Sequence, residues 1–202
     1  MNEYPKIDTL YVRDERTHKI IVPKWRNPEL EYLSRCLWDV DEKIDGTNIR
    51  IKWDGQSVSF GGRTDAAQIP ANLINVLNAT FTADKFAGKN PMCLYGEGCG
   101  AKIQKGGGNY KSDGVMFVLF DVLVDRWWLR SGDIEDVARE FSVDVAPRIG
   151  IMNLHDVTEF VRCGIQSTYG AFPAEGVVVR PQIPLSNRSG HRIIGKLKCK
   201  DF

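Results

Sequence analysis

The run Val115–Val124 constrains the fold more than any other stretch of this chain. It is apolar at both alternating sets of positions and is interrupted only by Asp121. A strand with two apolar faces is buried on both sides, so the run predicts a central strand of a sheet. It is also too short to span a bilayer. A buried acid costs free energy unless it has a partner, so Asp121 is expected to be hydrogen-bonded or paired.

Shorter patterns place other strands and helices around this run. Alternation of Ile49 and Ile51 with polar residues predicts a strand with one buried face, which has Lys43 at its start and runs to Trp53. A two-residue turn at Asp54-Gly55 is predicted to follow it. Asn27 before Pro28 predicts a helix start. Further elements are predicted as strands at 92–95, 175–180 and 193–199 and as helices at 70–77, 133–141 and 156–163. This mixture predicts an α+β domain with largely antiparallel sheets flanked by helices.

The composition excludes several classes of protein. A formal net charge of +1 provides no whole-molecule attraction to nucleic acid or anionic lipid, although a local cluster can still bind either. The five cysteines are odd in number, scattered and without Cys-x-x-Cys spacing, so neither a zinc site nor a disulfide framework is indicated. Residues 1–6 lack an apolar signal region. We therefore expect a cytosolic protein, not bound to membranes, with one domain over residues 1–202.

One lysine lies in a short acidic segment with a glycine turn, Glu42-Lys43-Ile44-Asp45-Gly46-Thr47-Asn48. A lysine amine is a nucleophile only when it is neutral, so a site that uses Lys43 must disfavour the ammonium by burial or by nearby cations. Arg63 follows the next predicted strand, so the two side chains are expected on neighbouring antiparallel strands, facing one cleft. The alternative is an ordinary surface lysine in a hairpin.

Two further clusters of lysines stand out. Lys196, Lys198 and Lys200 alternate near the end of the chain, and a strand would put all three amines on one face. Such a row is unfavourable unless an anion lies against it; the alternative is a solvated edge strand. The second cluster is a glycine-rich loop that carries Lys102, Lys105, Tyr110 and Lys111. It could contact a phosphate backbone or be a mobile surface loop.

Together these features suit nucleotidyl transfer. A lysine nucleophile attacks an α-phosphorus, a lysine row neutralises the phosphate oxygens, carboxylates hold a divalent metal, and an aromatic face stacks on a base.

The order of the segments resembles the covalent nucleotidyltransferases, which include RNA and DNA ligases and capping guanylyltransferases. Residues 42–48 look like motif I in the form of the phage-type RNA ligase 2 and RNA-editing ligase group. Five later segments are similar to motifs Ia, III, IIIa, IV and V, respectively Gly62-Arg63, Tyr95-Gly96-Glu97, Phe120-Asp121, Glu175-Gly176-Val177-Val178 and Leu197-Lys198-Cys199-Lys200. The resemblance covers residues 38–202 and implies the nucleotidyltransferase (ATP-grasp-like) fold.

The resemblance also implies roles for individual residues. It makes Lys43 the lysyl-AMP residue and Glu175 the metal-linked acid. It assigns the nucleotide to a larger set: Glu42 at the adenine edge, Phe120 on the adenine face, Glu97 at the ribose, Asn48 and Arg63 near ribose and phosphates, Lys198 and Lys200 at the α-phosphate, and Ile44 in the binding segment. Supporting positions are Asp45, Asp121 and Lys196. For Phe120, plain core packing is the alternative.

The implied activity is ATP-dependent RNA ligation through lysyl-AMP, with Mg²⁺, joining 5′-phosphate and 3′-hydroxyl RNA ends, nicked or hybrid duplexes among them. We expect a monomer without a C-terminal accessory domain, helped by an accessory protein or domain in trans. Three alternatives stay open: a DNA ligase core, a capping enzyme that uses GTP, and a non-catalytic RNA- or nucleotide-binding module.

Overall fold

The computed structural model describes residues 3–202, which form two compact units. Of the described residues, unit 1 contains Glu3, Tyr4 and Ile44–Ala146, and unit 2 contains Pro5–Lys43 and Pro147–Phe202. The chain therefore leaves unit 2 directly after Lys43. The single domain expected over residues 1–202 stays a prediction. The structure shows that the described residues divide into these two units. Among the described helices, none combines the length and the apolar character that crossing a membrane requires.

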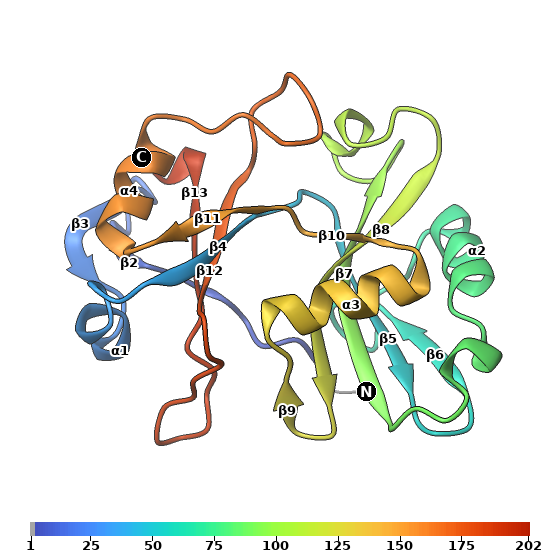
Figure 1. Ribbon diagram of the computed structural model, residues 1–202. Coiled ribbons are helices and arrows are strands. Elements are labelled where there is room, and N and C mark those ends of the chain that lie inside the picture. The colour runs from blue at the N-terminus through green and yellow to red at the C-terminus, as the bar shows by residue number, and fades with distance from the viewer. Residues whose placement is uncertain (1–2) are drawn as a thin grey trace. The chain divides into compact units, whose positions relative to one another are not determined.

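The sheet of unit 1 has the strand order β10-β8-β7-β5-β6, with β9 also paired to β8 (Figure 1). Its strands are β5 (Thr47–Trp53), β6 (Val58–Gly61), β7 (Met92–Gly100), β8 (Val115–Val124), β9 (Trp127–Trp128) and β10 (Asp144–Val145). Every pair is antiparallel except β8–β10. The central position predicted for the apolar run is confirmed, because β8 has neighbours on both edges.

Two helices cover one face of this sheet. They are α2 (Ala71–Thr80) and α3 (Ser131–Phe141), which share a buried apolar cluster with β5, β7 and β8. Leu73 and Leu77 of α2 are fully buried, and burying such a side chain stabilises the fold by roughly 1.5–3 kcal/mol. The opposite face carries a second cluster in which Tyr4 and Phe120 pack around Tyr95. Short 3-10 turns occur at Ala83–Phe86 and Gly107–Asn109.

Two details of the predicted hairpin are wrong. Its loop has four residues, 54–57, because the Asp54 carboxylate accepts hydrogen bonds from the backbone N–H groups of Gln56 and Ser57 (2.9 and 2.8 Å). In addition, β5 has a buried residue on its second face as well. Arg50 is completely buried opposite Ile49 and Ile51, and its guanidinium bonds to the Gly62 carbonyl (2.6 Å).

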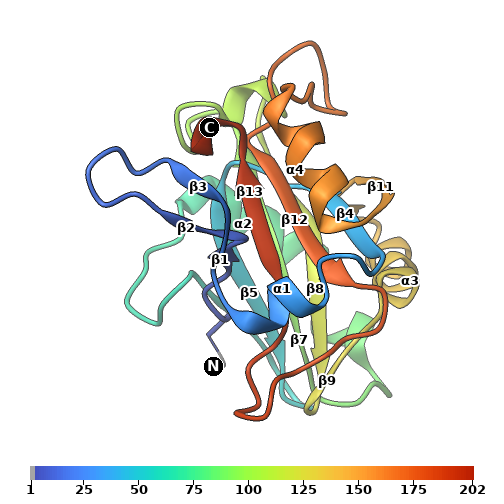
Figure 2. The ribbon, with the colours of Figure 1, turned by 90° about the vertical axis from the view of Figure 1, so that its left-hand side faces the viewer.

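The main sheet of unit 2 has the order β1-β13-β12-β4-β11 (Figure 2). Its strands are β1 (Asp8–Thr9), β4 (Trp38–Glu42), β11 (Arg148–Met152), β12 (Gly176–Pro181) and β13 (Gly195–Lys198). The hairpin of β2 (Tyr11–Arg13) and β3 (Ile20–Trp25) forms a separate small sheet. The main sheet is antiparallel except for the pair β1–β13.

Helices α1 (Pro28–Tyr32) and α4 (Leu154–Arg162) share a buried core with one face of the unit 2 sheet. The predicted helix start is confirmed, since the Asn27 side chain accepts a hydrogen bond from the N–H of Leu30 (2.9 Å). Trp38 and Val40 of β4 point into this core. Alternation therefore puts Lys43, Lys196 and Lys198 on the opposite, polar side of the sheet.

The structure corrects two expectations about the lysines. Lys43 does not lie on β5 beside the strand that precedes Arg63; it follows β4 in unit 2, while Arg63 follows β6 in unit 1. Lys200 is not on a strand either. β13 ends at Lys198, and the 3-10 turn Cys199–Asp201 carries Lys200, because Asp201 caps this turn and ends the strand.

Candidate active site

Lys43 is held against β12 at two points. Its backbone N–H donates to the carbonyl of Gly176 (2.9 Å), and its Nζ lies 2.6 Å from Oε2 of Glu175. The Lys43 side chain is 21% exposed. The amine is therefore kept in one place by a neighbouring strand and is still reachable from solvent.

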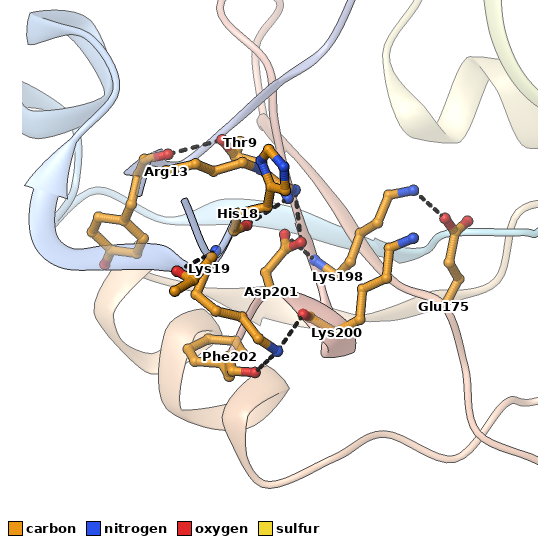
Figure 3. Close-up of polar contacts among 11 residues, drawn as sticks. Thr9, Arg13, His18, Lys19, Glu175, Lys198, Lys200, Asp201 and Phe202 are labelled. Atoms are coloured by element: carbon orange, nitrogen blue, oxygen red, sulfur yellow. Dashed lines mark hydrogen bonds and ion pairs between the residues drawn. The ribbon is translucent and has the colours of Figure 1, made fainter. Parts of the chain in front are cut away.

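Glu175 lies between two amines, since its other oxygen pairs with Nζ of Lys198 (Figure 3). Gly176 lets β12 and β13 lie close enough for the contact between Glu175 and Lys198, because a Cβ at position 176 would lie 2.1 Å from the carbonyl oxygen of Leu197. Burial by itself would raise the pKa of Glu175, but Lys43 and Lys198 outweigh it and hold the pKa below its ordinary value. Glu175 is thus an anion shared by two cations.

The lysine row contributes further positive charge to the same place. Burial, with added repulsion from Lys43 and Lys198, lowers the pKa of Lys196 to about 8. The lowered pKa means that nearby negative charge does not fully balance the ammonium of Lys196. A bound anion would supply the missing negative charge. The half-buried side chains of Lys196 and Lys198 share one face of β13 as predicted. The exposed side chain of Lys200 extends from the 3-10 turn toward the side of Glu175 (Figure 3). This arrangement suits phosphate oxygens.

Glu42 points to the other side of β4 and is buried. Its carboxylate accepts hydrogen bonds from the Ser167 hydroxyl (2.5 Å) and from the backbone N–H and hydroxyl of Thr168 (2.9 and 2.7 Å). Ser167 and Thr168 are therefore part of this site, and sequence reasoning missed them. No local pattern marks them, because the contacts join residues 125 and 126 positions apart.

In unit 1, Phe120 and Asp121 lie where β8 departs from regular pairing. Tyr95 is opposite Asp121 and Gly96 is opposite Leu119, so Phe120 is an extra residue in β8, a β-bulge. Bulges re-aim side chains and are frequent beside active sites. The neighbouring glycine is required sterically, because a Cβ at Gly96 would lie within 2.5 Å of the next strand and its side chains.

Tyr4 contacts both residues of the bulge. Its hydroxyl donates to Oδ2 of Asp121 (2.7 Å), which confirms the expectation that this buried acid has a partner. Its ring centroid lies 5.1 Å from that of Phe120, with the ring planes at 70°. Phe120 itself is half-buried. Nothing in the sequence pointed to Tyr4, which lies 117 positions from Asp121.

The other expected nucleotide residues of unit 1 are less closely grouped. Asn48 of β5 lies directly opposite Glu97 of β7, and both are half-buried, so their side chains can meet one ligand on the same face. Asp45 is held by the glycine-rich loop, since its N–H donates to the Tyr110 hydroxyl (3.1 Å). Ile44 is a buried apolar side chain. Arg63 is exposed.

The model of the family described as RNA ligase matches residues 37–198. The chain belongs to the RNA ligase family. By sequence, no curated protein matches it significantly.

Solved structures in the RNA ligase family have the same fold. Naegleria gruberi RNA ligase with PPi superposes with a TM-score of 0.68 at 18% identity, covering 85% of this chain and 52% of that one. A variant of that ligase with ATP and Mn gives a TM-score of 0.69 at 17% identity, covering 97% and 57%. The predicted α+β nucleotidyltransferase fold is confirmed. The chain spans little more than half the length of these relatives.

The residues of this RNA ligase family member fit a divalent cation at Glu175. Within residues 3–202 no group of three or more metal-ligating side chains occurs. Mg²⁺ does not need such a group, because it commonly binds through one or two carboxylates, waters and substrate phosphates. Glu175 supplies one ionised carboxylate beside the amines that suit phosphate.

Removing the Tyr4 hydroxyl is a test of how the bulge is held. We expect Tyr4→Phe to keep the ring contact with Phe120 but leave buried Asp121 without this donor, destabilising the protein by about 1–3 kcal/mol. Tyr4→Ala should destabilise it further because the ring contact is lost as well. Thermal unfolding measures both. Equal stability of wild type and Tyr4→Phe would show that the hydroxyl does not support Asp121.

Proposed function

We propose that this chain is an ATP-dependent RNA ligase that works through a covalent lysyl-AMP at Lys43. The neutral amine attacks the α-phosphorus of ATP; an N–P bond forms, the P–O bond to pyrophosphate breaks, and a proton is lost to solvent. An oxygen of the 5′-phosphate of an RNA strand then attacks the AMP phosphorus; a P–O bond forms, the N–P bond to Lys43 breaks, and the lysine nitrogen takes up a proton. Finally, a 3′-hydroxyl attacks that phosphate, AMP leaves, and the strand is joined.

The observation that carries this proposal is the convergence of amines on one carboxylate. Nζ of Lys43 and Nζ of Lys198 both contact Glu175, and the pKa of neighbouring Lys196 is lowered to about 8, first by burial and then by those cations. Lys198 and Lys200 would bind the α-phosphate oxygens as negative charge develops there.

Other residues are assigned on the family resemblance. Glu175 would hold Mg²⁺, which when bound supplies positive charge for the phosphate oxygens. In unit 1, Phe120 would stack on the base, and Glu97 and Asn48 would bind the ribose side of the nucleotide. Their placement in a bulge and in a cross-strand pair supports these roles.

RNA ends are the proposed partners, because the family model that matches is that of RNA ligases. We propose in addition that the protein acts as a monomer and that an accessory protein or domain extends its grip on RNA. The cytosol is the proposed compartment, supported by the free thiols of all five cysteines.

Intact-mass spectrometry tests the proposal. The protein is incubated with Mg²⁺ and either ATP or GTP, and the mass is then measured under denaturing conditions. An AMP adduct supports the ligase. A GMP adduct instead would indicate a capping enzyme, and a protein that takes up neither nucleotide would indicate a binding module; either result contradicts the proposal.

The glycine-rich loop gives a separate prediction about RNA. Lys102, Lys105 and Lys111 are all exposed, while Tyr110 ties the loop to Asp45. We expect replacement of the three lysines by alanine to weaken RNA binding. Binding should also depend less on salt concentration, because fewer phosphate contacts release fewer counterions from the RNA. Self-adenylylation should be unchanged.

The control, which removes one positive charge fewer than the loop variant, replaces Lys52 and Lys85, two exposed lysines elsewhere in unit 1. Titrating RNA at two salt concentrations compares the two variants. If both weaken binding equally, or neither does, the loop is not an RNA contact.

A further inference from the structure

Lys200, the last lysine of the row, lies on a 3-10 turn that is held by contacts of its own. In a continuing strand, Lys200 would share a face with Lys196 and Lys198. Because β13 ends at Lys198, the direction of Lys200 depends on the 3-10 turn Cys199–Asp201. Figure 3 shows the side chains of Lys198 and Lys200 extending in the same direction, on the side of Glu175.

Asp201 fixes the start of this turn. Its side chain is fully buried, and Oδ2 accepts a hydrogen bond from the N–H of Lys198 (2.9 Å). The N–H of Cys199 donates to the backbone carbonyl of Glu175 (3.0 Å). The turn is therefore anchored at Lys198, which precedes it, and at Cys199, its first residue. The anchor of Cys199 is Glu175, the residue that pairs with Lys43.

The charge of Asp201 is balanced from the β2–β3 hairpin. One terminal nitrogen of Arg13 lies 2.6 Å from Oδ1 of Asp201, and the other donates to the carbonyl of His18 (3.0 Å). A buried carboxylate requires such a partner, because an uncompensated charge in the interior is strongly destabilising. Lys19 of the same hairpin donates to the carbonyl of Lys200 (3.0 Å), as the dashed line in Figure 3 marks.

We propose that Arg13 and Asp201 are positioning residues that set the directions of Lys198 and Lys200 for the nucleotide phosphate. The inference rests on the proposed function, because it assigns the pair a role in AMP transfer to Lys43. The physical reason is repulsion: amines that crowd one carboxylate spread apart unless the backbone that carries them is held. The contact between Arg13 and Asp201 spans 188 positions, so no motif reports it.

Four variants test the inference. Arg13→Ala removes the counter-charge, Arg13→Lys restores a cation, and Asp201→Asn removes the charge but keeps an acceptor for the N–H of Lys198. Arg26→Ala is the matched control, because Arg26 belongs to the same unit and pairs with Asp8 only at 3.8 Å on the surface. The rate constant of AMP transfer and the KM for ATP are measured for each, with thermal unfolding at the assay pH.

We expect Arg13→Ala and Asp201→Asn to slow AMP transfer on the order of 10- to 100-fold, the range typical of a small misplacement of groups that bind the reacting phosphate. Arg13→Lys should recover most of the rate, and Arg26→Ala should match wild type. In a Lys200→Ala background, Asp201→Asn should cause a smaller loss than it does in wild type, because only the direction of Lys198 is then left to disturb.

The inference is overturned if Arg13→Ala and Asp201→Asn transfer AMP at the wild-type rate, or if each loss of rate equals the loss of folded protein. Absence of an adduct in wild type overturns the proposed function instead. In that case the side-chain NMR signals of Lys198 and Lys200 test whether Arg13 positions these lysines. The signals should shift in Arg13→Ala and not in Arg26→Ala, and unchanged signals in Arg13→Ala would overturn the inference.

Discussion

Lys43→Arg is expected to abolish AMP transfer to the protein completely while leaving the protein folded. Arginine keeps the positive charge, so it can retain the contact with Glu175 that Lys43 makes at 2.6 Å. Its guanidinium does not lose a proton in proteins, so it offers no neutral nitrogen to attack phosphorus. Intact mass after incubation with ATP and Mg²⁺ measures the loss.

The control for Lys43→Arg is Lys24→Arg, an exposed lysine on β3 of the same unit, which should adenylylate normally. A second measurement separates the chemical steps. RNA supplied with a 5′-adenylate already attached does not need the amine, so Lys43→Arg should still join it. An AMP adduct on Lys43→Arg, mapped by peptide mass to any other lysine, would show that Lys43 is not the nucleophile.

Glu175→Gln is expected to slow AMP transfer on the order of 10²–10³-fold, the cost of removing one preorganised electrostatic group from a reaction centre. The amide keeps the shape of the side chain but removes the negative charge that Lys43 and Lys198 share. The two amines then repel each other without a counter-charge, and the proposed Mg²⁺ ligand becomes a weak neutral one.

Rapid-quench measurement of lysyl-AMP formation over a range of Mg²⁺ concentrations tests this prediction. The matched control is Glu159→Gln, which removes an exposed acid of α4 that pairs with Arg162 at 3.3 Å. If Glu175→Gln reacts as fast as Glu159→Gln, the carboxylate has no part in the first step.

Local sequence patterns predicted a large share of the fold because they report backbone conformation and the sidedness of burial. Asn27 capped its helix as expected, and the run Val115–Val124 became a strand with neighbours on both edges. The same patterns could not predict Arg50. Alternation separates the two faces of a strand, but it does not say whether a loop covers the second face, as residues 62–65 do here.

The sequence by itself determined which residues carry the family's motifs and in which order they come, since those are properties of the chain. Only the tertiary structure decided which of them meet. Lys43 and Glu175 are 132 positions apart, and Glu42 is held by two residues that no pattern marked. Contacts at such separation depend on how strands pair and where a strand ends, which is why Lys200 proved to lie on a turn held by Arg13 and Asp201.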